Sequence, residues 1–221
     1  MPVYTRARIC KQPSGELSAV TPVSSAAKRI VVLLSGAGSN LQALLERSLG
    51  GQVVRVVSDQ LGAGALDLAR ARNVEAVAVD RREFADRQAW EKALREVVTE
   101  AAPDVVVLAG FMRILSGAFV SRWPTLNVHP SLLPAFPGAH AVADALRHGV
   151  KVTGATVHFV VEQVDAGPIV AQESVAVRSN DTIETLHARI KAVEHRLLPD
   201  SVTLFCHDRL AIDGRRVRIL P

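Results

Sequence analysis

Short apolar runs alternate along the chain with longer segments whose apolar positions fall three or four residues apart. The runs are too short for helices and are typical of strands buried on both faces; they cover 30–34, 53–58, 76–79, 105–109 and 126–129. The amphipathic segments predict helices at 41–45, 63–72, 85–102 and 116–123. Strands that alternate with helices indicate an α/β fold, with a mostly parallel, twisted sheet covered by helices on both faces.

The pattern changes after Gly138. A helix is predicted at 142–148, whereas 153–161 and 169–177 alternate between apolar and polar residues, as antiparallel strands do. A long helix at 182–205 contains Pro199, which can disturb it. The pair Asp213-Gly214 predicts the turn of a closing hairpin. Antiparallel strands are therefore expected toward the C-terminal end.

Three parts are expected along the chain. Residues 1–28 are rich in Pro, Ser, Ala and Thr without apolar periodicity, which predicts a mobile leader. Residues 29–208 form one domain, and 209–221 a C-terminal hairpin or tail. With 48% hydrophobic residues, the domain can bury a substantial core.

The net charge of +4 is confined to the start of the chain. Residues 1–29 hold five basic residues and one acidic residue, and the remainder holds 21 of each sign. A nucleic-acid partner requires a clustered basic face, so none is expected. The chain has no apolar run long enough to cross a membrane, and the leader lacks the apolar stretch of a secretory signal. Neither a membrane partner nor export is expected.

The two cysteines, Cys10 and Cys206, form neither a disulfide framework nor a metal-ligand spacing. This usage fits a reducing, cytoplasmic location, and no metal site is predicted.

The densest chemical signal is the stretch 126–138, where three prolines and a glycine follow a short strand that carries Asn127 and His129. Residues two apart on a strand share a face, and Pro130 ends the strand, so both side chains lie at its carboxyl end. Asp165, in a loop restricted by Gly and Pro, is the carboxylate we expect to join them.

This trio suits acyl transfer to an amine. Asn127 can donate to the oxygen that becomes negative, and His129 can donate a proton or hydrogen bond. Asp165 would raise the pKa of His129 and favour its protonated form. No serine or cysteine nucleophile is evident, which fits direct attack by a substrate amine. Each residue alone also has an ordinary role in a turn or polar contact.

Gly36 and Gly38 lie between a buried strand and a helix, where backbone N–H groups bind anions. A dinucleotide fingerprint would have a small residue at the position of Leu41, so a monophosphate is favoured over NAD. Ser39 or Asn40 can cap the helix and also face the phosphate. A tight turn without a ligand is the alternative.

Three further signals are weaker. The apolar loop 111–115 with Arg113 follows a strand and could hold a flat aromatic ligand, or could simply cover the core. Lys191 and Glu194 share a helix face and could contact a sugar or amine, or pair with each other. His158 is expected to be purely structural.

Five ordered motifs together resemble one family, the glycinamide ribonucleotide formyltransferases of purine biosynthesis. They lie between about 29 and 205 and comprise 35–40, 104–115, 127–134, 154–159 and 165–168. The resemblance implies a Rossmann-like formyltransferase fold, 10-formyltetrahydrofolate as co-substrate and no required metal. Two departures are Ala37, where the family commonly has asparagine, and the leader, which has no counterpart in the minimal domain.

The resemblance also implies residue roles. Asn127, His129 and Asp165 match the catalytic trio, with His129 as proton donor and Asp165 raising its pKa. Gly38, Ser39 and Asn40 match the phosphate-binding loop, and Lys191 and Glu194 the helix that reaches the ribose and glycine ends of the substrate. The bond between Leu133 and Pro134 matches one that can be cis. The residues that match the family's folate-binding positions are Arg87, Met112, Arg113, Ile114, Leu115, Asn127, Glu162, Gln163, Val164 and Asp165.

Three rival functions are weighed. An enzyme that formylates initiator tRNA is expected to carry a further RNA-binding region, and a formyl-folate hydrolase an N-terminal regulatory domain. A non-catalytic phosphate-binding module would use only the glycine loop and leave the trio without a shared purpose. Small-molecule substrates are therefore the expected partners, and the protein is expected to be a monomer or homodimer.

Overall fold

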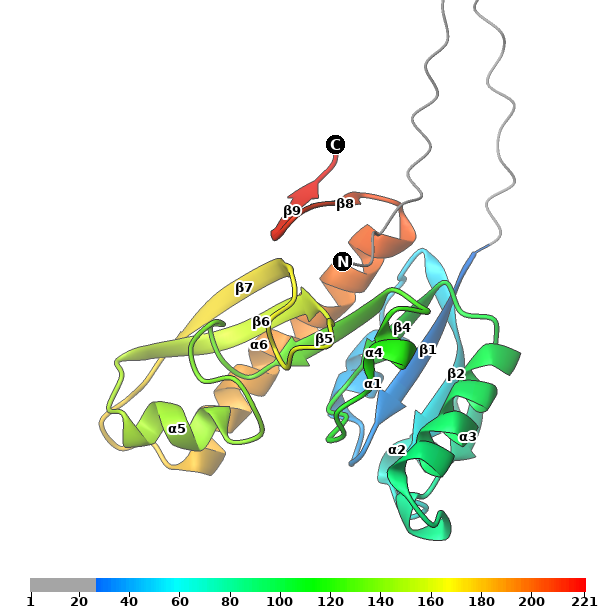
Figure 1. Cartoon of the computed structure of the whole chain (residues 1–221). Helices are drawn as coiled ribbons and strands as arrows, with labels where there is room; N and C mark the ends of the chain where they lie inside the picture. The colour runs from blue at the N-terminus through cyan, green and yellow to red at the C-terminus, as the bar shows by residue number, and fades with distance from the viewer. Residues whose placement is uncertain (1–26) are drawn as a thin grey trace, which may run out of the picture.

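The computed structural model describes residues 27–221, so most of the predicted leader lies outside the described residues. Nine strands form one sheet in the order β3-β2-β1-β4-β5-β6-β7-β9-β8 (Figure 1). The strands are β1 (Lys28–Leu34), β2 (Gly51–Ser58), β3 (Glu75–Ala78), β4 (Val105–Leu108), β5 (Thr125–His129), β6 (Val152–Phe159), β7 (Ile169–Ala176), β8 (Leu210–Asp213) and β9 (Arg216–Ile219). The helices are α1 (Ser39–Leu45), α2 (Gly64–Ala71), α3 (Arg87–Glu100), α4 (Gly117–Val120), α5 (Ala141–Arg147) and α6 (Ile183–Cys206), with a 3-10 turn η1 at Arg81–Glu83.

The sheet has a parallel half and a largely antiparallel half. Strands β3, β2, β1, β4 and β5 pair in parallel. Strand β6 is antiparallel to both β5 and β7, and the hairpin of β8 and β9 joins the sheet where β9 pairs in parallel with β7. The predicted fold class is confirmed, as is the closing hairpin, but its turn is Gly214-Arg215 and not Asp213-Gly214, because Asp213 still pairs with Arg216.

The core lies on both faces of the parallel half. In β1, Ile30, Val32 and Leu34 pack against α1, α2 and α6, while Val31 and Leu33 face α3 and α4; all five are fully buried. Full burial of such a side chain stabilises by about 1.5–3 kcal/mol. A central strand with layers on both sides therefore requires the continuous apolar run seen in the sequence.

Helix α6 is continuous through Pro199, so the expected disturbance does not occur. Thr182 and Thr185 form a capping box at its start, and Leu198 and Val202 are buried on either side of Pro199. Packing thus outweighs the one hydrogen bond that proline removes. No helix within 27–221 is long and apolar enough to cross a membrane.

Other element boundaries differ from the prediction for local reasons. Strand β1 begins at Lys28, because Lys28 already pairs with Gly51. Helix α4 covers only Gly117–Val120, and Pro124 prevents it from reaching Trp123, because a proline disfavours helical geometry in the residue before it. Helix α3 begins after Asp86, whose carboxylate accepts from the N–H of Ala89. The η1 turn was not predicted.

Burial on α6 can be tested with a matched pair of isoleucines. Ile190 lies on the face of α6 that packs against the core and is fully buried, whereas Ile183 on the same helix is 48% exposed. Ile190→Ala should lower the free energy of unfolding by about 2–5 kcal/mol, because it leaves a cavity. Ile183→Ala should cost less than about 1 kcal/mol. Urea denaturation measures both, and equal losses would contradict this packing.

Candidate active site

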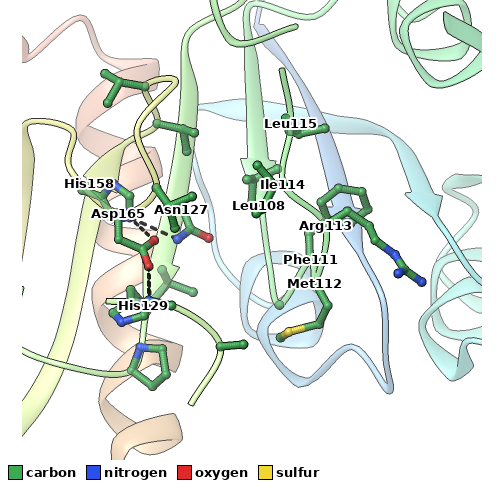
Figure 2. Close-up of a pocket in the computed structure, with 18 of the residues that line it drawn as sticks. Leu108, Phe111, Met112, Arg113, Ile114, Leu115, Asn127, His129, His158 and Asp165 are labelled. Carbon is green, nitrogen blue, oxygen red and sulfur yellow. Dashed lines mark hydrogen bonds and ion pairs between the residues drawn. The ribbon is translucent and has the colours of Figure 1, made fainter. Parts of the chain in front are cut away.

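The trio Asn127, His129 and Asp165 lines one cavity of about 340 Å³. Asn127 and His129 point from the same face of β5, and Asp165 reaches them from the loop after β6 (Figure 2). Strand β5 is where the sheet changes from parallel to antiparallel pairing. The structure therefore brings together the three side chains that the sequence singled out.

The ring of His129 is held from both sides. Its Nε2 lies 2.8 Å from the carbonyl oxygen of Phe136, and its Nδ1 lies 3.4 Å from Oδ2 of Asp165. A carbonyl only accepts, so Nε2–H is the donor, and Nδ1 is the nitrogen that gains a proton. Phe136 has a φ of 52°, so the proline-rich loop uses left-handed backbone at the residue that orients the imidazole.

Asp165 acts on the pKa of His129 in the expected direction, but the net shift is opposite to the one expected. Burial lowers the pKa of His129 below its ordinary value, although the contact with Phe136 and the charge of Asp165 both act to raise it. The nearby His158 also acts to lower it. Desolvation disfavours the charged ring more than the carboxylate favours it. Because the unfolded chain binds this proton more readily, the folded state loses stability as the pH falls through about 6.5.

Asp165 stays ionised in this environment. Burial by itself would raise the pKa of its carboxyl, but the nearby His158 ring, the hydrogen bond from the N–H of Gly138 and the charge of His129 together outweigh burial, so the pKa is lowered. The Gly138 N–H lies 2.7 Å from Oδ2. The proline-rich loop, whose Leu133-Pro134 bond is cis, therefore contacts both His129 and Asp165.

His158 is a fourth member of the site that the sequence analysis missed. It lies directly opposite Asn127 on β6, and its Nε2 is 3.1 Å from Nδ2 of Asn127 and 3.6 Å from Oδ1 of Asp165. Its Nδ1 donates to the carbonyl of Phe159, which leaves Nε2 of the neutral ring as an acceptor. The Asn127 amide is thereby oriented with Nδ2 toward His158.

The glycine loop lies at the same edge of the sheet. Ser35 accepts the N–H of Met112 through Oγ, and its own N–H donates to the carbonyl of Gly110, so the loop adjoins the cavity wall. The residue that precedes α1 is Gly38, with a φ of 87°, and neither Ser39 nor Asn40 caps the helix through its side chain. The capping prediction is wrong because the chain enters α1 through left-handed backbone.

Asn40 instead connects the glycine loop to α6. Its Nδ2 donates to Oε2 of Glu194 over 2.9 Å, and both residues are buried. Burial raises the pKa of Glu194, although the Asn40 bond and the charge of Lys191 act to lower it. One residue predicted for the phosphate therefore contacts one predicted for the ribose end, although neither Asn40 nor Glu194 lines the cavity of the trio.

Most of the predicted folate residues surround the cavity. Arg87 lines an adjacent cavity and donates from Nη2 to the carbonyl of Ile114 over 2.9 Å. Gln163 lines neither cavity; it is exposed, and its carbonyl accepts from the N–H of Ala166 in a turn. The cavity walls include Met112, Arg113, Ile114, Leu115, Glu162 and Val164. Within 27–221, no group of three His, Cys, Asp or Glu side chains could hold a metal ion.

The electrostatics of the site can be checked by titration. We expect the NMR titration midpoint of His129 to lie below 6.5 in the ligand-free protein. Asp165→Asn should move it further down, because the carboxylate charge is one of the influences that raise it. Asp200→Asn, on the surface beside Arg47, is the control that should leave it unchanged. An upward move in Asp165→Asn would refute the assignment.

The backbone of the glycine loop offers a second test. A Cβ on Gly38 would lie 2.6 Å from Cβ of Ala65, whereas a Cβ on Gly36 meets nothing within 4 Å. Gly38→Ala should lower the free energy of unfolding by at least about 1 kcal/mol. Gly36→Ala should change it by less than about 0.5 kcal/mol. Thermal or urea unfolding of the two variants compares them directly.

Comparison with known proteins places this site in a family. A family model described as formyl transferase matches residues 28–202. The phosphoribosylglycinamide formyltransferase of Mycobacterium tuberculosis is 47% identical over 195 residues, which cover 86% of this chain and 91% of that protein. The Escherichia coli protein of the same name is 40% identical over 201 residues, with 85% and 95% covered.

Two further similarities agree. The trifunctional purine biosynthetic protein adenosine-3 of Bos taurus is 45% identical over 195 residues; the match covers 85% of this chain, which spans only 19% of that longer protein. The crystal structure of glycinamide ribonucleotide transformylase 1 from Symbiobacterium toebii has a TM-score of 0.85 at 48% identity, covering 88% of this chain and 95% of that one. The chain therefore belongs to the formyl transferase family and, within it, to the phosphoribosylglycinamide formyltransferases.

Proposed function

We propose that the protein transfers a formyl group from 10-formyltetrahydrofolate to the glycyl amine of N1-(5-phospho-D-ribosyl)glycinamide, a step of purine biosynthesis. The observation that carries this proposal is the convergence of Asn127, His129 and Asp165 in one cavity lined in part by the apolar segment 111–115, which is hydrogen-bonded to Ser35 at the start of the glycine loop. The cavity offers polar groups for the reacting amine and carbonyl and an apolar wall for a flat folate, and the adjoining glycine loop offers backbone N–H groups for a phosphate.

The neutral amine attacks the formyl carbon directly, and the carbonyl electrons move to oxygen. Asn127 stabilises the resulting oxyanion, because one proton of Nδ2 is directed at His158 and the other is left for the ligand. The amide is thus oriented before the reaction begins, which avoids reorganisation in the transition state.

His129 supplies the second stabilising contact. Its Nε2–H is engaged by Phe136, so the proton that matters is on Nδ1, between the ring and Asp165. The 3.4 Å separation is longer than an ordinary charged hydrogen bond, which leaves the Nδ1 proton available to a ligand oxygen. Negative charge that develops on this oxygen adds to that of Asp165 and favours the imidazolium form.

The tetrahedral intermediate then collapses. The attacking nitrogen loses a proton, which passes through a water molecule near Asp165 to the departing folate nitrogen as the carbon–nitrogen bond breaks. The reaction forms one carbon–nitrogen bond and breaks another, and it needs no covalent enzyme intermediate and no metal.

The remaining assignments concern binding. Gly38, Ser39 and Asn40 hold the phosphate, and Lys191 and Glu194 reach the ribose and glycine end from α6. The Asn40–Glu194 hydrogen bond supports this assignment, because it joins the two groups at one point. Arg87 and the segments 112–115 and 162–165 surround the folate, although Gln163 lines neither cavity.

The proposed function is tested by following folate release by absorbance, with 10-formyltetrahydrofolate present and with or without the ribonucleotide. Release that requires the ribonucleotide is expected. Release without it would indicate a formyl-folate hydrolase, and no release under either condition would refute the proposal.

The oxyanion role predicts a large effect at one residue. Asn127→Ala should lower kcat by roughly 100- to 1,000-fold, since one oxyanion donor contributes about 2.7–4 kcal/mol. Asn127→Asp should lower kcat to a similar extent, because a carboxylate replaces the amide donor. Asn180→Ala, in an exposed turn, is the matched control and should retain full turnover. Near-normal turnover in Asn127→Ala would rule out this role.

A further inference from the structure

One wall of the cavity is a short segment with exposed apolar side chains. Residues 112–116, here called the pocket segment, carry Met112 at 67% exposure and Ile114 at 59%. Apolar side chains next to a cavity gain free energy by folding into it, which would close the cavity in the free protein. To keep the cavity open, the backbone of this segment must therefore be held by contacts with other parts of the chain.

Polar contacts hold the pocket segment at almost every residue. Ser35 accepts the N–H of Met112 over 2.9 Å, and Arg87 donates to the carbonyl of Ile114 over 2.9 Å. Glu91 accepts from both the N–H and the hydroxyl of Ser116. These anchors come from the end of β1 and from α3, so they tie the segment to rigid elements.

The anchor of Arg113 differs from the others, because it is an ion pair with a buried acid. Nε of Arg113 donates to Oδ2 of Asp59 over 2.6 Å. The Asp59 side chain is fully buried directly after β2, while the Arg113 side chain is 44% exposed. Oδ1 of Asp59 has no hydrogen-bond partner in the described part of the chain. Arg113 is thus the cation that compensates this buried charge.

The guanidinium of Arg113 does not point at the trio. Figure 2 shows it directed away from Asn127, His129 and Asp165, although the residue lines the cavity. Asp59 itself does not line the cavity. The pair therefore acts on the cavity through the backbone of the pocket segment.

We propose that Asp59 is a positioning residue for the co-substrate: by holding Arg113, it keeps the pocket segment open as a preformed wall for the folate. This inference rests on the proposed function. Asn127, His129 and Asp165 belong to β5 and to the loop after β6, which the pair does not touch. Loss of the pair should therefore weaken folate binding and leave the chemical step intact.

Steady-state kinetics of Asp59 variants test the proposal. Asp59→Leu should raise KM for 10-formyltetrahydrofolate roughly tenfold, the value of one charged hydrogen bond, with kcat and KM for the ribonucleotide within about twofold. Asp59→Asn retains an oxygen that accepts from Arg113 and should raise that KM less than about threefold. The double variant Asp59→Leu/Arg113→Met should be no worse than Asp59→Leu, because the two residues act as one unit.

A buried ion pair elsewhere supplies the control. Asp181 is also almost fully buried and pairs with Arg189 over 2.6 Å beside the start of α6. Asp181→Leu should lower stability and leave KM for the formyl-folate unchanged. If Asp59→Leu does not fold, the double variant replaces it, because it also removes the Arg113 charge that the single variant leaves without its partner.

Equilibrium binding of 10-formyltetrahydrofolate, measured by tryptophan fluorescence, separates this inference from the proposed function. A wild-type protein that binds the compound without transferring its formyl group would refute the function, while the Kd of the variants would still decide the role of Asp59. Unchanged folate KM and Kd in Asp59→Leu, or equal losses in kcat and in both KM values, would overturn the inference. Absence of folate binding by the wild-type protein would overturn both.

Discussion

The pairing of β5 with a parallel strand on one side and an antiparallel strand on the other is the constraint on which the site depends. Parallel neighbours require helical crossovers, which cover the first half of the sheet, whereas β6 and β7 are joined by a loop. That loop passes over the end of β5 and carries Asp165. The antiparallel register also places His158 opposite Asn127. One change of strand direction therefore assembles side chains from distant parts of the chain.

Within the site, directional hydrogen bonds define the state of the histidine rings more than charge does. Burial makes the imidazolium of His129 less favourable, even with a carboxylate 3.4 Å away. What the carbonyls of Phe136 and Phe159 provide is a fixed tautomer for each ring, so the protonation sites on both histidines are defined. The polar groups are compatible with their burial because nearly all of them have partners.

Sequence patterns predicted the parts that depend on local periodicity. The strands of the parallel half follow from apolar runs such as 30–34, and the positions of Asn127 and His129 follow from their spacing and from Pro130. The rest depends on tertiary contacts. His158 requires the register of β6 on β5, Asp59 requires contact with a residue 54 positions away, and the pKa of His129 depends on burial. Gly38 shows that even a helix start is decided by the chain path before it.

Ser35 has a consequence that concerns distance. Its N–H and Oγ contact Gly110 and Met112 on the folate side, and the next residues along the chain are the glycine loop. The two proposed half-sites are thus joined by two hydrogen bonds and a few peptide units, and the single side chain involved is the short one of Ser35. Under the proposed function, the separation between a phosphate at the glycine loop and a folate at the segment 111–115 would be set by the length of this backbone. Ser35 would then fix the distance between the two half-sites, and an acceptor whose amine lies at another distance from its phosphate would not reach both.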